Sequence, residues 1–152
     1  MRFLKLFSLL ALVACSFSIN SCSDKTDVNV IRKLGIVMDG TQEVPAKPGA
    51  WNGTMDIEYN KDTRLLFYKI TWNSLSGAPI AAHIHGLGAK GFAAPVIQTF
   101  SGFTAATAGT FSGSVFIDGV VFKEESLYAG EYYINMHTAL NPGGEIRGQV
   151  QF

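Results

Sequence analysis

Residues 51–72, WNGTMDIEYNKDTRLLFYKITW, contain two runs of alternating apolar and polar side chains. Apolar residues or glycine occupy every second position from Trp51 to Tyr59, and apolar residues do so again from Leu66 to Trp72. Successive side chains of a β-strand point to opposite faces, so this period of two predicts two half-buried strands. The polar stretch NKDT between the runs has the residue types of a turn. The segment therefore predicts an antiparallel hairpin.

The same pattern continues outward from this hairpin, beginning at Ile31. Further short strands are expected at 79–85, 95–100, 110–117, 119–123, 131–137 and 145–152. One short helix is expected within 123–129. Eight or nine short strands separated by turn residues and many glycines predict an all-β antiparallel sandwich or closed barrel. A chain of 152 residues accommodates one such domain.

Residues 1–21 have the pattern of an export signal. Arg2 and Lys5 give a positive start, and the apolar run that follows is shorter than the ~20 residues of a membrane-spanning helix. Both cysteines, Cys15 and Cys22, lie in this segment or at its edge, so no disulfide is expected in the mature domain.

The segment around Cys22 resembles a bacterial lipobox, whose cysteine is lipidated and becomes the new N-terminus. A full-length apolar run precedes Cys22 and polar residues follow it, so residues 22–33 are expected to be the palmitoylated cysteine and its tether. Cys15 is the alternative lipidation site, and an ordinary secreted protein is a third possibility.

Charge limits the partners that the mature chain can have. Without residues 1–21 it carries ten basic and twelve acidic side chains, a small negative net charge. Nucleic-acid binding normally requires a basic stripe, so we expect no nucleic-acid partner. The lipid is then the expected link to the membrane, in a bacterial cell envelope and facing either the periplasm or the outside. A protein or glycan ligand remains unidentified at this stage.

All three histidines fall in two short motifs, AHIHG at 82–86 and NMHT at 135–138. The two-residue period puts His83 and His85 on one face of a strand, and it puts His137 on the face opposite its strand's apolar residues. Three imidazoles, two of them from a His-x-His strand, are a plausible ligand set for copper or zinc. The alternative is a structural role, in which the histidines bond loops at the end of the sandwich.

The last strand adds two charged candidates. Glu145 is expected opposite His137 in a closing hairpin, where it could fix the tautomer of that histidine from outside the ligand set. Arg147 would then lie diagonally within reach of His137 and could attract an anion. The alternative is a solvated surface pair of little energetic weight. The sequence contains no clear nucleophile–base set, so no catalytic residue is predicted.

Four segments together resemble the CHRD domain, the module named from chordin, over residues 34–152. They are GTQEVP at 40–45, AHIHG at 82–86, GEYYINMHT at 130–138 and GGEIRGQV at 143–150. The resemblance implies a Greek-key sandwich, immunoglobulin-like or dismutase-like, with no established catalytic activity. It favours an envelope-anchored, non-catalytic binding or structural module.

A fainter resemblance links the chain to copper/zinc superoxide dismutase. In that family a His-x-His pair and a late histidine bind copper, and an arginine near the C-terminus guides the anion. His83, His85, His137 and Arg147 follow this order here. Because no histidine lies between His85 and His137, the bridging histidine and the zinc set have no counterpart. The alternative function is therefore a copper-binding, dismutase-like metalloprotein with a three-histidine site.

Overall fold

The computed structural model describes residues 29–152, and the expected signal, Cys15 and Cys22 lie outside them. The described chain is almost entirely β-structure, which confirms the predicted fold class. Its elements are β1 (Val30–Asp39), a 3-10 turn η1 (Gly40–Gln42), β2 (Asn52–Asn60), β3 (Leu65–Asn73), β4 (Pro79–His85), β5 (Val96–Thr99), β6 (Gly109–Phe116), α1 (Glu124–Tyr128), β7 (Tyr132–Thr138) and β8 (Ile146–Val150).

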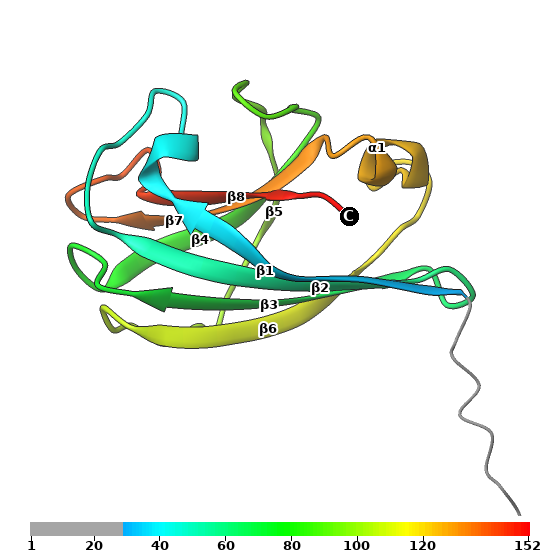
Figure 1. Cartoon of the computed structure of the whole chain (residues 1–152), viewed down its shortest axis with the longest axis horizontal. Helices are drawn as coiled ribbons and strands as arrows, with labels where there is room; N and C mark the ends of the chain where they lie inside the picture. The colour runs from blue at the N-terminus through cyan, green and yellow to red at the C-terminus, as the bar shows by residue number, and fades with distance from the viewer. Residues whose placement is uncertain (1–28) are drawn as a thin grey trace, which may run out of the picture.

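The eight strands form one curled antiparallel sheet in the order β5-β4-β7-β8-β1-β2-β3-β6. Among the described residues, β1 and β8 are paired in register at a single position, Asp39 opposite Arg147. The sheet bends at this junction, so that β7 and β8 lie above β1, β2, β3 and β6 (Figure 1). Two four-stranded halves thus enclose the core in the manner of a sandwich.

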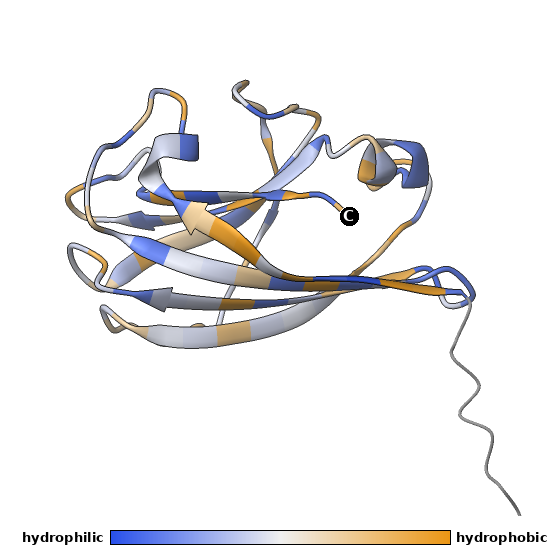
Figure 2. Cartoon of the chain, viewed as in Figure 1, coloured by the Kyte–Doolittle hydropathy of each residue, from blue (hydrophilic) through white to orange (hydrophobic). Residues whose placement is uncertain are grey.

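The predicted hairpin forms the centre of one half. β2 and β3 pair in register, with Met55 opposite Ile70 and Ile57 opposite Tyr68, and the apolar members of both runs are buried except Trp51, which is partly buried. Hydrophobic and hydrophilic residues accordingly alternate along the strands (Figure 2). The turn is closed by Asn60, whose side chain accepts hydrogen bonds from two backbone N–H groups of the following residues. This hairpin confirms the expectation from residues 51–72.

The prediction of a strand at 119–123 is wrong. The carboxylate of Asp118 accepts hydrogen bonds from the backbone N–H groups of Val120, Val121 and Phe122, at 2.8–3.0 Å. A side chain that satisfies three successive N–H groups replaces the ladder bonds of a strand with a local loop. The short helix expected just after it is present as α1.

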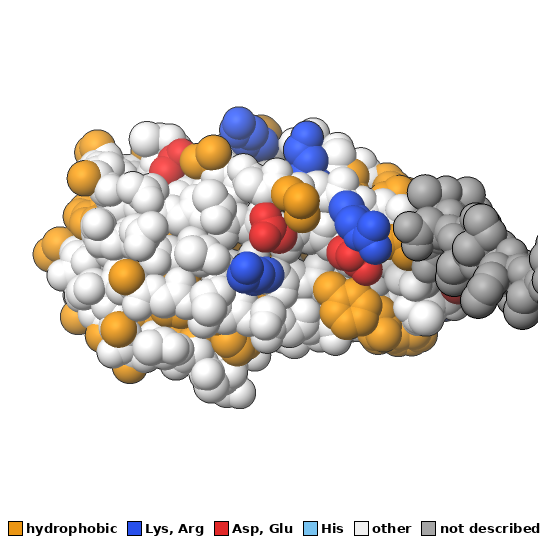
Figure 3. Space-filling model, turned by 60° about the horizontal axis from the view of Figure 1, so that its bottom comes forward, with side chains coloured by type: hydrophobic (Ala, Val, Ile, Leu, Met, Phe, Trp, Pro, Cys, Tyr) orange, Lys and Arg blue, Asp and Glu red, His pale blue; other side chains and the backbone are white. Residues whose placement is uncertain are grey.

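Two further features bear on the expected organisation. β1 begins at Val30, so residues 30–33, expected to belong to the tether, form the start of a strand. Within residues 29–152 no helix combines the length and apolar character needed to cross a membrane. Viewed from below, the surface carries charged side chains of both signs with separate apolar side chains between them (Figure 3).

Candidate metal site

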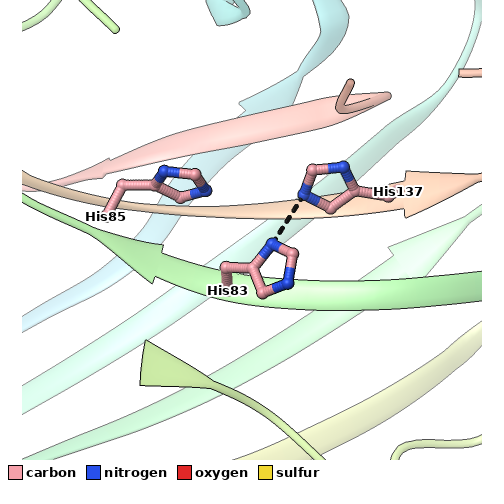
Figure 4. Close-up of side chains that lie close together, drawn as sticks. All are labelled: His83, His85 and His137. Carbon is pink, nitrogen blue, oxygen red and sulfur yellow. Dashed lines mark hydrogen bonds between the residues drawn. The ribbon is translucent and has the colours of Figure 1, made fainter. Parts of the chain in front are cut away.

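The three histidines meet on the outer face of β4 and β7. The two strands are antiparallel neighbours, with His83 opposite Asn135 and Ala81 opposite His137. The register therefore places the rings side by side, and one ligand nitrogen from each of them lies within 4.8 Å of the others. His83 Nδ1 is 2.9 Å from His137 Nε2 (Figure 4). Strand parity predicted that each histidine lies on the polar face of its strand. The pairing of β4 with β7 then brings the three rings close together.

Backbone carbonyls fix the protonation pattern of two of the rings. His85 Nδ1 lies 2.9 Å from the carbonyl oxygen of Ala94, and His137 Nδ1 lies 2.9 Å from that of Pro142. A carbonyl oxygen can only accept a hydrogen bond, so both Nδ1 atoms carry the proton and both Nε2 atoms present a lone pair. Metal-binding histidines are commonly oriented in this way by a second hydrogen bond.

The surroundings favour the neutral form of His83 and His137. Burial lowers the pKa of His83, and the neighbouring rings of His137 and His85 lower it further. Burial also lowers the pKa of His137, against the opposing effect of its hydrogen bond to Pro142. Because a metal ion binds the neutral imidazole, these shifts keep the two rings in the binding form near neutral pH.

Asn135 joins the histidine cluster, although sequence reasoning did not select it. Its side chain is 2 % exposed, and its Oδ1 lies 3.0 Å from both His85 Nε2 and His137 Nε2. Strand parity could have identified it, because it precedes His137 by two residues and must share its face. Amides are common on β-strands, so this signal alone would not have distinguished it.

Glu43 lies behind Asn135. It follows η1 and is 7 % exposed, and the Asn135 side chain acts on its carboxyl as a hydrogen-bond donor. Burial raises the pKa of Glu43 to about 6, while the bond from Asn135 and the positive charge of Arg147 act to lower it. Gly144 leaves the space for this carboxylate, since a Cβ at that position would overlap Glu43 Oε1. No spacing in the sequence connects position 43 with position 135.

A stack of three side chains supports His85. The ring of Tyr133 is parallel to that of His85 at 4.5 Å, and the Arg147 guanidinium lies 3.4 Å from the centre of the Tyr133 ring. Arg147 is 1 % exposed and donates to the backbone carbonyls of Ala89 and Phe92. This arginine therefore ties residues 89–92 to β8, and its expected role toward an anion stays a prediction.

Glu145 lies next to the position expected for it, since the pairing of Met136 with Ile146 leads on to His137 and Glu145, but its carboxylate has other partners than His137. Its fully buried carboxylate accepts hydrogen bonds from the Ser76 backbone N–H and hydroxyl, the Thr138 hydroxyl and the Asn141 amide. Burial would raise the pKa of Glu145, but these bonds hold it below its ordinary value. The histidine-orienting role expected of Glu145 falls to the Pro142 carbonyl, and Glu145 ties the β3–β4 connection to the β7–β8 loop.

Together these features define an all-β sandwich-type module with a histidine cluster on its outer face. A family model for the CHRD domain matches residues 34–150, and the chain therefore belongs to the CHRD domain family. This match confirms the resemblance found in the four segments of the sequence. Comparison with curated proteins and with solved structures found no match.

Proposed function

We propose that this protein is a non-catalytic CHRD module of the bacterial cell envelope that binds a copper ion through His83, His85 and His137. Membership of the CHRD family fits a module without catalytic activity. The observation that carries the copper proposal is the convergence of three imidazoles within 4.8 Å. Two of them are held by carbonyls in the tautomer that presents Nε2.

The dimensions of the cluster suit a transition-metal ion. Nitrogen ligands at ~2.0–2.1 Å from an ion lie at most ~4.2 Å apart. Since the nitrogens are within 4.8 Å of one another, a pair at that limit would have to close by about 0.6 Å to bind on opposite sides of an ion, and by more to bind at a smaller angle. Imidazole suits several ions, and the usual affinity order of divalent metals favours Cu²⁺ over Zn²⁺. His83, the least buried of the three, marks the side open to an entering ion.

Copper occupancy tests this proposal. Protein exported to the periplasm of an expression host and dialysed against Cu²⁺ is expected to hold one ion per chain. The His83→Ala/His85→Ala double variant is expected to hold none, because one imidazole seldom retains a metal alone. Ser114→Ala, on the opposite half of the sandwich, is the matched control and should bind like the wild type. Equal copper content in the wild type and the double variant would exclude the site.

Attachment to the envelope is the second part of the proposal, supported by the lipobox-like segment before Cys22. The full chain expressed in a bacterial host with radioactive palmitate is expected to be labelled and to sediment with membranes. Cys22→Ala is expected to abolish the label, whereas Cys15→Ala should leave most of it. Label that depends on Cys15 would reassign the anchor, and unlabelled wild-type protein would indicate simple secretion.

A further inference from the structure

The histidine cluster has fewer protons than its short contacts require. His83 Nδ1, His85 Nε2, His137 Nε2 and Asn135 Oδ1 are connected by three contacts of 2.9–3.0 Å. The two Nε2 atoms and the amide oxygen are acceptors, because the carbonyl-bonded rings carry their proton on Nδ1. Neutral His83 can supply one proton. Two of the three contacts therefore bring lone pairs together, an arrangement that a cation would relieve.

The orientation of the Asn135 amide is decisive for this count, because a turned amide would offer its NH₂ to the histidines instead. Glu43 prevents that turn. Oδ1 lies 3.0 Å from both Nε2 atoms, and the Asn135 side chain lowers the pKa of Glu43 as a donor does, so Nδ2 faces the carboxylate.

Glu43 is itself held in place. It is enclosed between Asn135 and Gly144, where only a glycine leaves room for the carboxylate. Its Oε1 is buried and has no hydrogen-bond partner among the described residues. A buried carboxylate that is only partly satisfied is costly unless a nearby positive charge compensates it. Arg147 contributes one such charge, and an ion among the histidines would contribute another on the far side of Asn135.

We propose that Asn135 Oδ1 is a fourth ligand of the bound copper ion and that Glu43 is the positioning residue that aims it. This inference rests on the proposed function. The donor set is then three imidazole nitrogens and one amide oxygen, a combination suited to Cu²⁺ or Zn²⁺. Glu43 does not contact the ion itself; it sets the orientation of the Asn135 amide, which does.

An exchange of acceptor and donor tests the pair. Glu43→Gln allows the amide of Asn135 to turn, because the new side chain both donates and accepts. The affinity for Cu²⁺ at about pH 7.5 is expected to fall about 10–100-fold, as for other supports of metal ligands. In Glu43→Gln/Asn135→Asp, the amide introduced at position 43 donates to the carboxylate introduced at position 135, whose second oxygen faces the imidazoles. This double variant is expected to recover at least the wild-type affinity.

Affinity is measured by competition with a chromophoric copper chelator, and the ligand set is measured by electron paramagnetic resonance of the Cu²⁺ protein. Glu43→Gln is expected to shift the copper hyperfine splitting, and the double variant to return it toward the wild-type value. Glu58→Gln, the same change on an exposed carboxylate of the opposite half, is the control and should alter neither readout. If Glu43→Gln does not fold, Asn135→Ser removes the amide oxygen with Glu43 in place and should give the same loss.

The outcomes separate the two proposals. Wild-type protein that binds no copper overturns the proposed function itself. Copper binding with unchanged affinity and spectrum in Glu43→Gln and Asn135→Ser overturns the fourth ligand and leaves the three-histidine site. Weakened binding in Glu43→Gln without recovery in the double variant overturns the positioning role of Glu43.

Discussion

Replacement of Glu145 by alanine is expected to lower the free energy of unfolding by about 1–3 kcal/mol. The carboxylate is fully buried and accepts from four donors. After its removal the hydroxyls of Ser76 and Thr138 can still bond to each other, since they lie 2.9 Å apart. The buried Asn141 amide would lose its partner, and an unsatisfied buried donor costs about 1–3 kcal/mol, whereas Ser76 is exposed and its N–H can bond to water. Urea denaturation monitored by tryptophan fluorescence measures the loss.

Glu125→Ala is the control for this loss, because Glu125 is exposed in α1 and its removal should change stability by no more than about 0.5 kcal/mol. A Glu145→Ala variant as stable as this control would show that the carboxylate bonds contribute nothing net. The β7–β8 loop holds Pro142, so the alanine variant should also disturb the ring of His137.

The contribution of Glu145 also depends on pH, with a sign fixed by its lowered pKa. The native state binds the proton less readily than the unfolded chain does, so the stabilisation is fully present above the ordinary value of 4.5. It is lost as the pH falls below 4.5 through the native value. The stability difference between the metal-free wild type and Glu145→Gln should therefore shrink over this range. A difference that stays constant down to pH 3 would contradict the shift.

Copper is expected to stabilise the protein by about 4 kcal/mol when the free ion is present at about a thousandfold excess over its dissociation constant. Under the proposed function the ion would bind the folded chain, where β4 and β7 bring the three histidines together, and not the unfolded chain, which lacks this arrangement. Most of the stabilisation should disappear in His137→Ala, because His137 contacts both His83 and Asn135. Urea denaturation of each variant with and without Cu²⁺ gives the comparison.

For each variant the free energy of unfolding without Cu²⁺ is subtracted from the value with Cu²⁺. This difference does not include the stability that His137→Ala loses when the Pro142 carbonyl has no hydrogen-bond donor. Ser114→Ala, on the opposite half of the sandwich where it pairs with Phe67, is the control expected to keep the full copper effect. Equal stabilisation of the wild type and His137→Ala would show that copper binds elsewhere on the chain.

Local patterns predicted the strands well, because the alternation in residues 51–72 reports burial directly. They failed at 119–123, where the apolar residues resemble a strand but the Asp118 carboxylate captures the backbone N–H groups. Parity also placed the histidines on the correct faces. Proximity depended on the pairing of β4 with β7, which are separated in the chain by β5, β6 and α1.

The partners of Glu145 and Glu43 could not be predicted from the sequence, because they also depend on contacts between distant segments. Glu145 receives two of its hydrogen bonds from Ser76, 69 positions earlier in the chain. Glu43 lies near Asn135 because the segment after β1 packs against the β7–β8 loop, where Gly144 has no Cβ to overlap the carboxylate. Such contacts depend on loop paths, which carry no periodic signal. The charge of Arg147 favoured a solvent-facing side chain, whereas Arg147 is 1 % exposed and donates to the carbonyls of Ala89 and Phe92 and to the Gln149 side chain.

Alternate residues of β7 have two different roles, in the core and in the histidine cluster. Ile134 and Met136 point into the core, while Asn135 and His137 point to the outer face and its cluster. An apolar side chain can thus be exchanged on one face of the strand without moving a donor atom on the other. The inward residues of the strand thus support the fold, and its outward residues carry the donor atoms of the cluster. A set of variants with new donors at the outward positions could tune the preferred ion while the sandwich beneath stays the same.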